Sequence, residues 1–429
     1  MEKPPLKKKK IAMLVPGTGN FFCGSCLRDH SLAKGLIQLN HDVTMVPLYL
    51  PHVSEDGVKT APLFFGGINV FLQQFSFLRI LPHWLNRFLD NNALLTFISR
   101  FAGFTSAKTL GALTLSSFHV DKSGQNIEFK KMVRWLATEL KPDCLILSNC
   151  LLAGFAKTLK KELQCPVYCT LQGEDSFLDS LVEPYRSQSW EALRECSQDI
   201  DLFMPVSDTY GRIMSERLDL DLNKVKTVYN GIDLSGIPHD KKPDDNFTIA
   251  YLANIIPEKG LGTLVDAFIL LRKKYPETLI RLMILGSTTP FTKNYLKSII
   301  TKLEHAGVYN EVIIKTNLSK DEKFSFLSKA SVLSVPATYG ESFGLYILEA
   351  LAVGVPVVQP DHGAFPELIE KIQGGLICKA NDVEDLAEKI FHLIENPELR
   401  LELGQKGKQV VLNEFNNLSM AKRVLELIR

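Results

Sequence analysis

Among its 429 residues the chain has no apolar run approaching the roughly 20 residues that a membrane-spanning helix requires. It also lacks an excess of either charge. The net charge of +1 creates no broad field for nucleic acid, so we expect no nucleic-acid partner. The eight cysteines are scattered, without a dense disulfide framework, which favours reduced thiols and a cytoplasmic location. These absences argue against a membrane-spanning protein, a disulfide scaffold and a broad nucleic-acid binder.

The N-terminus is similar to a signal peptide only in part. The lysines Lys7–Lys10 precede an apolar run, Ile11–Val15, that Pro16 follows at once. This run is too short for the hydrophobic region of a signal peptide. We therefore expect a solvated tail, with a membrane-surface anchor as the alternative.

The length predicts two domains, since a single core rarely serves more than about 250–300 residues. β-like runs alternate with helix-length segments, which indicates doubly wound parallel sheets of the α/β class. The alternation restarts at Phe247, after the polar segment Pro238–Asn246, so we predict Rossmann-like domains over residues 1–237 and 247–416. The predicted strands are Ile11–Val15, Val43–Val46, Cys144–Leu147, Val167–Leu171, Leu202–Val206 and Val225–Val228, then Phe247–Leu252, Leu279–Leu285, Val312–Lys315, Val332–Val335 and Val355–Val358.

The most informative stretch is Glu341–Val358. It places a carboxylate in a loop, then a glycine, a short apolar helix with a second carboxylate, and a β-branched run. If the intervening residues are helical, Glu349 lies about 12 Å beyond Glu341, so the two carboxylates cannot share one proton or one metal ion. The first-turn amides between them would favour an anion. These amides belong to Ser342, Phe343, Gly344 and Leu345.

Two separated carboxylates around an anion site suit a nucleotide-sugar, because a carboxylate accepts hydrogen bonds from vicinal hydroxyl groups. The alternative interpretation is a buried amphipathic helix with two incidental acids. A glutamate in such apolar surroundings is seldom fully buried without a partner, which favours the ligand interpretation.

The same pattern resembles the Glu-x7-Glu signature of the retaining GT-B glycosyltransferases, the large glycogen-synthase-like family called group 1 or family 4. The resemblance implies two facing Rossmann-like domains with a central cleft, and a terminal helix over residues 417–429 that returns to the first domain. It also implies retaining transfer of a hexosyl group from a nucleoside diphosphate-sugar, which is a substrate, so no cofactor is expected. The resemblance spans most of the chain and is specific for Glu341–Val358.

On this resemblance the second domain binds the donor. Glu349 holds the ribose, Glu341 holds hydroxyl groups of the sugar, and Lys259 faces the diphosphate. The family places an arginine five residues before that lysine. Here Asn254 takes its place, without charge and without a forked contact. The glycine-rich loops near the donor correspond to Gly17, Gly19 and Gly286.

The first domain departs from the family at a histidine. The family's Thr-x-His-Gly motif corresponds to Thr170-Leu-Gln-Gly173, in which Gln172 cannot shuttle a proton. In a retaining enzyme of this type the departing phosphate can accept the acceptor's proton, so a protein base is not compulsory. We expect Gln172 to position the sugar and Asp175 or Glu174 to assist the acceptor. The alternative for these acids is solvation at a strand end or a helix N-cap.

Leu63–Phe118 interrupts the alternation with ten of the twenty-five phenylalanines, Trp84 and interspersed basic residues. We expect helical insertions. Three interpretations stay open: a subdomain with its own core, a lipid-facing patch that contacts the membrane peripherally, and a lid for the acceptor. The acceptor is unidentified, with a lipid-linked molecule or a glycan as candidates. The phenylalanines are Phe64, Phe65, Phe71, Phe75, Phe77, Phe88, Phe97, Phe101, Phe104 and Phe118.

Two further motifs have weaker chemical interpretations. Cys23-Gly-Ser-Cys26 has redox spacing, but its glycine-loop context favours a structural or cleft-lining role over a redox or metal role. Asp219-Leu-Asp221 has the letters of a metal-diphosphate motif but lies away from the glycine-rich loops, so we expect no metal.

Asn254 and Gln172 motivate the alternative of a catalytically impaired relative that binds a nucleotide-sugar or a partner. A dehydrogenase is disfavoured, because no Gly-x-Gly-x-x-Gly turn follows a first strand with an acid about 20 residues further on.

Overall fold

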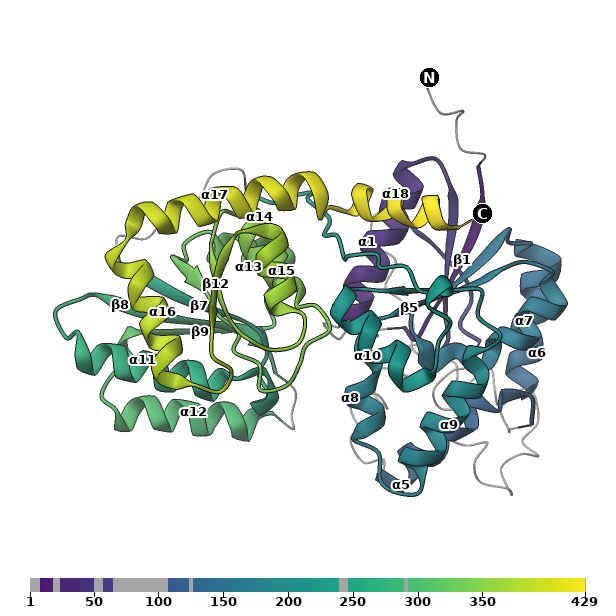
Figure 1. Cartoon of the computed structure of the whole chain (residues 1–429), viewed down its shortest axis with the longest axis horizontal. Coiled ribbons are helices and arrows are strands. Elements are labelled where there is room, and N and C mark those ends of the chain that lie inside the picture. The colour runs from purple at the N-terminus through teal and green to yellow at the C-terminus, as the bar shows by residue number, and fades with distance from the viewer. Residues whose placement is uncertain are drawn as a thin grey trace. The chain divides into compact units, whose positions relative to one another are not determined.

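The computed structural model describes residues 8–17, 24–49, 57–64, 107–122, 126–238, 246–288 and 292–428. The chain divides into two compact units (Figure 1), the first formed by Met1–Tyr229 with Asn417–Arg429 and the second by Asn230–Asn416. The first unit thus ends before residue 237, where the sequence placed the boundary. The reason is that the amide of Ile232 donates to the carbonyl of Phe415 at 3.0 Å, which ties this segment to the second unit.

The first unit contains a six-stranded parallel sheet with the order β3-β2-β1-β4-β5-β6. β4 and β5 are buried along their whole length, as expected for parallel strands covered on both faces. The strands are β1 Lys10–Val15, β2 Asp42–Pro47, β3 Lys59–Thr60, β4 Cys144–Leu147, β5 Val167–Leu171 and β6 Leu202–Pro205.

The strand predicted over Val225–Val228 is wrong. This segment runs beside β6 but forms only an isolated bridge, between Val225 and Phe203. Two amides in it, those of Lys226 and Val228, donate to carbonyls of β6 at 2.9 Å.

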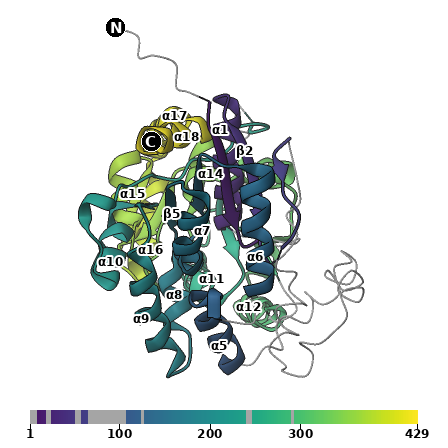
Figure 2. The ribbon, with the colours of Figure 1, turned by 90° about the vertical axis from the view of Figure 1, so that its right-hand side faces the viewer.

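α18, Asn417–Leu427, packs on α1, Gly24–Gln38, within the first unit (Figure 1). The two helices approach closely at Gly35, where a Cβ atom would lie 2.3 Å from the carbonyl oxygen of Asn417. Apolar side chains of both helices share one core with β1 and β2. In Figure 2, α8, α9 and α10 gather on one side of this unit. The other elements are α5 Ala107–Phe118, η2 Val120–Lys122, α6 Asn126–Trp135, η3 Leu136–Leu140, η4 Cys150–Phe155, α7 Ala156–Leu163, α8 Glu174–Asp179, α9 Tyr185–Ser197, α10 Asp208–Leu218 and η5 Leu222–Lys224.

The second unit repeats the architecture with a parallel sheet of order β12-β11-β10-β7-β8-β9. The strand predicted over Val355–Val358 begins two residues later, at Val357, whose amide donates to the carbonyl of Gly374. The strands are β7 Phe247–Asn254, β8 Ile280–Ser287, β9 Val312–Thr316, β10 Val332–Leu333, β11 Val357–Pro360 and β12 Gly375–Cys378.

Helices cover both faces of this second sheet. In Figure 1, α11 and α12 lie on one side of the strands, and α13 and α14 lie on the other. The helical elements are η6 Pro257–Lys259, α11 Leu261–Lys274, α12 Lys293–His305, η7 Tyr309–Glu311, α13 Lys320–Leu327, α14 Leu345–Ala352, α15 Phe365–Ile372, α16 Val383–Glu395 and α17 Pro397–Glu414.

Among the helices that the structure describes, none has the length and apolar character needed to cross a membrane.

Candidate functional site

In the second unit, Lys259 and Glu341 form an ion pair. Lys259 ends η6, just after β7, whereas Glu341 lies in the loop before α14. The Nζ atom of Lys259 lies 2.5 Å from Oε1 of Glu341 and donates to the Tyr339 hydroxyl at 2.7 Å. The hydroxyl of Tyr346 donates to the same carboxylate oxygen at 3.0 Å. The pair is largely enclosed, since its side chains are only 17% and 8% exposed.

The surroundings of Lys259 keep its ammonium charged. Burial by itself lowers the pKa of Lys259, but the Glu341 carboxylate and the Tyr339 hydroxyl outweigh burial and leave the pKa raised. Burial and the charge of Glu341 also raise the pKa of Tyr346, so its phenol stays a hydrogen-bond donor. A desolvated ammonium that stays protonated is suited to a phosphate or diphosphate group.

Glycines let neighbouring backbones approach this pair closely. Gly260 has a φ of +72°, and a Cβ atom there would lie 1.7 Å from the carbonyl oxygen of Pro336. Gly363 has a φ of +56°, and a Cβ atom there would lie 2.5 Å from the amide nitrogen of Glu341. The amide of Ala364 donates to the Glu341 carbonyl at 2.9 Å. Both ends of the segment from Pro336 to Glu341 are therefore held by close backbone contacts.

The helix after Glu341 begins later than the sequence predicted. α14 starts at Leu345, and its N-cap, Gly344, has a left-handed backbone with a φ of +93°. The amides of Ser342 and Phe343 thus precede the helix and do not form its first turn. Glu349 lies about one turn into α14, nearer its start than expected.

The carboxylate of Glu349 has a cationic partner. Its Oε1 atom lies 2.5 Å from Nζ of Lys323, which α13 contributes. Both side chains are mostly buried, at 13% and 16% exposure. No motif marks Lys323, because it lies 26 residues before Glu349 in the chain and meets it only through the packing of the two helices.

Asn254 and Gly286 lie at neighbouring strand ends. Asn254 is the last residue of β7 and pairs in register with Ser287, the last residue of β8. The hydroxyl of Ser287 donates to Oδ1 of the exposed Asn254 side chain. Gly286 is required by close packing, since a Cβ atom there would lie 2.3 Å from the carbonyl oxygen of Ala253.

In the first unit, Gln172 follows β5 at the carboxyl edge of the sheet. Its side-chain amide donates to the carbonyl of Ser148, whose hydroxyl donates to the carboxylate of Asp29. Asp29 and its neighbour Arg28, both from α1, form an ion pair at 3.1 Å with fully buried side chains. Sequence motifs did not indicate this buried pair. Its only signal is two adjacent opposite charges inside an otherwise core-facing helix.

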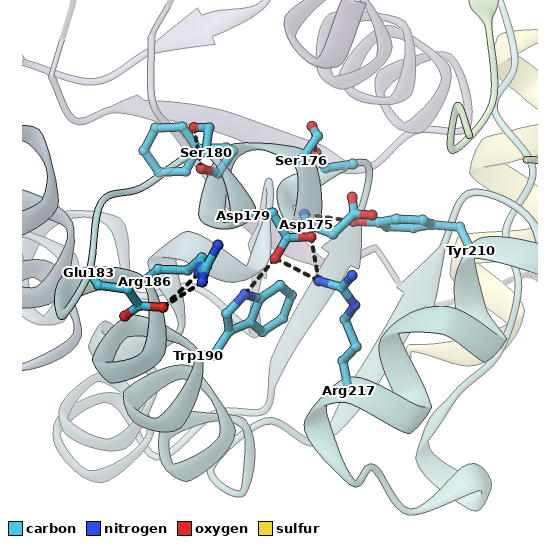
Figure 3. Close-up of polar contacts among 11 residues, drawn as sticks. Asp175, Ser176, Asp179, Ser180, Glu183, Arg186, Trp190, Tyr210 and Arg217 are labelled. Carbon is cyan, nitrogen blue, oxygen red and sulfur yellow. Dashed lines mark hydrogen bonds and ion pairs between the residues drawn. The ribbon is translucent and has the colours of Figure 1, made fainter. Parts of the chain in front are cut away.

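Glu174 fixes the turn that follows β5. Its two oxygens accept three backbone amides at 2.8 to 3.0 Å and the Tyr210 hydroxyl at 3.0 Å. Burial raises the pKa of Glu174, although these hydrogen bonds oppose the rise. Asp175 is less buried, and its Oδ1 accepts from the same hydroxyl at 3.0 Å (Figure 3). Of the two acids, Asp175 is the one with a partly exposed side chain.

A surface cluster joins α8, α9 and α10 beside Asp175 (Figure 3). Arg217 donates to the two carboxylate oxygens of Asp179 at 2.9 and 2.7 Å, and Trp190 Nε1 donates to the same carboxylate at 3.0 Å. The Arg217 guanidinium also lies 4.8 Å from the centre of the Trp190 ring. These mutual contacts connect the three helices.

Several predicted features fall outside the described residues. They include Gly19, Cys23 and most of Leu63–Phe118. Gly17 is described and has a φ of +84°. Of the phenylalanines in that segment, Phe118 is buried and Phe64 is half-buried, with its ring centre 5.5 Å from that of Trp135.

The described residues of the two weaker motifs lie in a helix or at helix ends. Cys26 is buried in α1, Asp219 ends α10 with a left-handed backbone, and Asp221 caps η5. In the described part of the chain, no group of three or more His, Cys, Asp or Glu side chains is placed to hold a metal ion.

Each of the two units matches a protein-family model. Residues 237–410 match the model described as glycosyl transferases group 1, and residues 115–235 match the one described as glycosyltransferase family 4. An uncharacterized glycosyltransferase of Methanocaldococcus jannaschii is 28% identical over 253 residues, which is 58% of this chain and 65% of that protein. This match and those to two further curated relatives span between 49% and 65% of the relatives' lengths.

Two solved structures are similar over nearly the whole chain. Sucrose-phosphate synthase from Thermosynechococcus elongatus has a TM-score of 0.72 at 16% identity and is matched over 98% of both chains. HepE from Anabaena, solved in complex with UDP and glucose, has a TM-score of 0.70 at 16% identity, over 98% of this chain and 99% of that one. At this identity the likeness concerns the fold.

Proposed function

Since the chain belongs to the group 1 glycosyltransferases and has the two-domain GT-B fold, we propose that it transfers a sugar from a nucleoside diphosphate-sugar to an acceptor. Of the predictions from the sequence, the family and the two-domain α/β fold are confirmed. The proposal depends most on one observation, the enclosed ion pair between Lys259 at the end of η6 and Glu341 in the loop before α14. A protonated ammonium suits the diphosphate, and the carboxylates of Glu341 and Glu349 suit hydroxyl groups of the sugar and the ribose.

The proposed reaction retains the configuration of the anomeric carbon and needs no metal. The bond between the anomeric carbon and the phosphate oxygen breaks, and the acceptor oxygen bonds to the same face of the sugar. The acceptor's proton passes to the departing phosphate, which leaves as part of the nucleoside diphosphate. Lys259 stabilises the negative charge that develops on this leaving group.

Glu341 has two roles in this proposal. It keeps Lys259 charged and in place before the donor binds, because its carboxylate is the largest influence that raises the pKa of Lys259. When the donor binds, its diphosphate shares the ammonium, and Glu341 accepts hydrogen bonds from the sugar. Gly286 and Asn254 line the neighbouring strand ends, where the amide of Asn254 replaces a cation. Gly17 belongs to the corresponding loop of the first unit.

On the acceptor side we assign Gln172 to the sugar and Asp175 to the acceptor. Gln172 is anchored on Ser148, and Asp175 is anchored on Tyr210 but stays partly exposed. The acceptor class is a lipid-linked molecule or a glycan, and Leu63–Phe118 is the segment we expect to contact it. Sedimentation with anionic and neutral liposomes tests the peripheral membrane contact. Equal recovery in the supernatant with and without liposomes would contradict it.

UDP and UDP-glucose are the first donors to test, because HepE was solved with each of them. In Lys259→Met, we expect UDP affinity and UDP release from UDP-glucose to fall at least about tenfold, the loss of roughly 1.4 kcal/mol. Calorimetry and a coupled UDP assay measure the two effects. Lys302→Met is the matched control, because Lys302 makes an exposed ion pair with Asp266. Equal affinity and turnover in wild type and Lys259→Met would contradict the proposal.

A second candidate function is a nucleotide-sugar-binding protein that does not catalyse transfer. Two features favour it: Asn254 adds no charge at the donor, and the Gln172 amide donates to a backbone carbonyl. The discriminating experiment combines UDP-sugar binding with a search for hydrolysis or transfer. Tight binding without turnover in wild type and in Asn254→Arg would favour this candidate.

A further inference from the structure

Arg28 is a buried cation that uses only part of its hydrogen-bonding capacity. The residue is 1% exposed. Its Nη1 atom donates to Oδ1 of Asp29 and to Oγ1 of Thr170, both at 3.1 Å. Its Nε and Nη2 atoms are buried, and neither has a hydrogen-bond partner in the chain as the structure describes it. Together, Nε and Nη2 form the edge of a guanidinium that can hold a carboxylate or phosphate through two parallel hydrogen bonds.

The contacts already made do not require this edge. Asp29 balances the charge of Arg28 through Nη1 alone, and its other oxygen accepts from Ser148. A lysine could make the same ion pair without presenting unpaired nitrogen atoms. Leaving a buried donor without a partner costs about 1–3 kcal/mol. Such groups in native structures call for an explanation, for example a water, an ion or a functional role.

The position of Arg28 favours a functional role. Thr170 lies near the carboxyl end of β5, and Ser148 directly follows β4. Arg28 lies one turn into α1, where the helix dipole favours negative charge. Open α/β sheets bind their ligands beyond the carboxyl ends of the strands. The unused edge of Arg28 is therefore at the side of the first sheet where a ligand is expected.

The hydrogen bonds of Arg28 and Asp29 continue to Gln172, the residue that we assign to the transferred sugar. Ser148 contacts Asp29 through its hydroxyl and Gln172 through its carbonyl. Arg28 is thus linked to Gln172 by three successive hydrogen bonds, through Asp29 and Ser148, inside the first unit. The cation that we assign to the donor diphosphate, Lys259, belongs to the other unit. An anion held by Arg28 is for these reasons assigned to the acceptor.

We propose that the Nε–Nη2 edge of Arg28 binds an oxyanion of the acceptor, a carboxylate or a phosphate group. This inference rests on the proposed function and adds the chemical class of the acceptor to it. An acceptor without such a group leaves two buried donors unpaired, so anionic acceptors should be favoured over neutral ones of the same shape.

Thermal denaturation with added inorganic phosphate or acetate tests the site at constant ionic strength. We expect a saturable rise in the midpoint temperature of wild type, because a ligand of the folded state stabilises it by mass action. Arg28→Lys keeps a charge next to Asp29 but loses the forked edge, and should need at least about tenfold more anion, a loss of roughly 1.4 kcal/mol. Arg217→Lys is the control and should titrate as wild type, since Arg217 also pairs with an aspartate through Nη1 but its side chain is 40% exposed, where charge pairing contributes little.

Three outcomes would overturn the proposal. A linear rise of equal size in all three proteins would report only the general effect of excluded salts. If neither anion changes the midpoint temperature of wild type, the proposal is overturned by the wild-type measurement alone. This result does not depend on whether Arg28→Lys folds. Weaker UDP binding in Arg28→Lys, with phosphate displaced by UDP, would assign the edge to the donor instead.

If the edge of Arg28 binds the acceptor, UDP and phosphate should bind independently of each other. UDP affinity should be the same in wild type and Arg28→Lys, and phosphate should still bind the UDP-saturated protein. A failure of the proposed function would give a different result. Wild type would then bind phosphate through Arg28 but would bind no nucleotide.

Discussion

The Nζ atom of Lys323 lies 2.5 Å from Oε1 of Glu349, although the two residues come from different helices, α13 and α14. Glu349 is the residue to which we assign the ribose. A carboxylate has about four lone-pair sites on its two oxygens, so one oxygen can hold Lys323 while the other accepts from a ribose hydroxyl. Lys323 is therefore proposed as a positioning residue that fixes the rotamer of Glu349.

Glu349→Ala should weaken UDP binding by about 1–3 kcal/mol, the magnitude of a hydrogen bond to a charged group. The variant should also bind UDP and 2′-deoxy-UDP with similar affinity, if the lost contact is to the ribose. Lys323→Met should weaken binding less, and the double variant should show non-additive effects because the two residues are in contact. Unchanged UDP affinity in folded Glu349→Ala would refute the assignment.

Gly260→Ala should destabilise the protein more than Gly307→Ala. Both glycines have a φ of +72°, so both substitutions carry the left-handed penalty of about 1–2 kcal/mol. A Cβ atom at Gly260 would also lie 1.7 Å from the Pro336 carbonyl oxygen, whereas a Cβ atom at Gly307 would have none of the described residues' atoms within 4 Å. Urea unfolding should show a further loss of about 1–3 kcal/mol for Gly260→Ala. Equal losses would mean that the loop carrying Lys259 adapts without cost.

Asn254→Arg should strengthen UDP binding, because it restores a second cation at an exposed strand end. For an exposed charge we expect a gain of about 0.5–1 kcal/mol, larger at low ionic strength where screening is weaker. Calorimetric titration at two salt concentrations measures both effects. Asn254→Gln is the control without charge. A gain in Asn254→Gln equal to that in Asn254→Arg would show that the added charge is not responsible.

Glu174 should make stability depend on pH in the acid range. Burial raises the pKa of Glu174 above the ordinary value of 4.5. Between 4.5 and the raised pKa, the folded state binds more protons than the unfolded state, so stability falls as the pH rises. The slope is limited to about 1.4 kcal/mol per pH unit for one group.

Glu174→Gln removes this titration, so its stability difference from wild type should narrow as the pH rises from 4.5. Unfolding by urea at several pH values measures the difference. Glu216→Gln, at an exposed carboxylate on α10, is the control. A difference that widens with pH would show that the sign is wrong.

Transfer should not require a divalent metal. The charge of the leaving diphosphate is assigned to Lys259. The chain has two Asp-x-Asp pairs, both in the first unit: Asp199 and Asp201 lie between α9 and β6, and Asp219 and Asp221 lie after α10. We expect the rate of UDP release from UDP-glucose to be the same with and without EDTA. Loss of activity with EDTA, and its return with magnesium or manganese, would disprove this.

The sequence alone determined the family and the two-domain α/β fold. Apolar runs mark β4 and β5 with the bounds that the structure has, because a buried parallel strand is encoded by its own residues. The motif around Glu341 is likewise local. The start of α14 was missed, since the left-handed backbone of Gly344 depends on the loops packed around it.

Only the tertiary structure decided which charges are paired. Lys323 meets Glu349 across 26 residues of chain, and Arg28 reaches Thr170 across 142. Neither separation along the chain corresponds to the period of a helix or a strand, so no pattern in the sequence predicts these two contacts. The unpaired edge of Arg28 could be recognised only from its surroundings, because a hydrogen bond depends on distance and direction in space and not on separation along the chain.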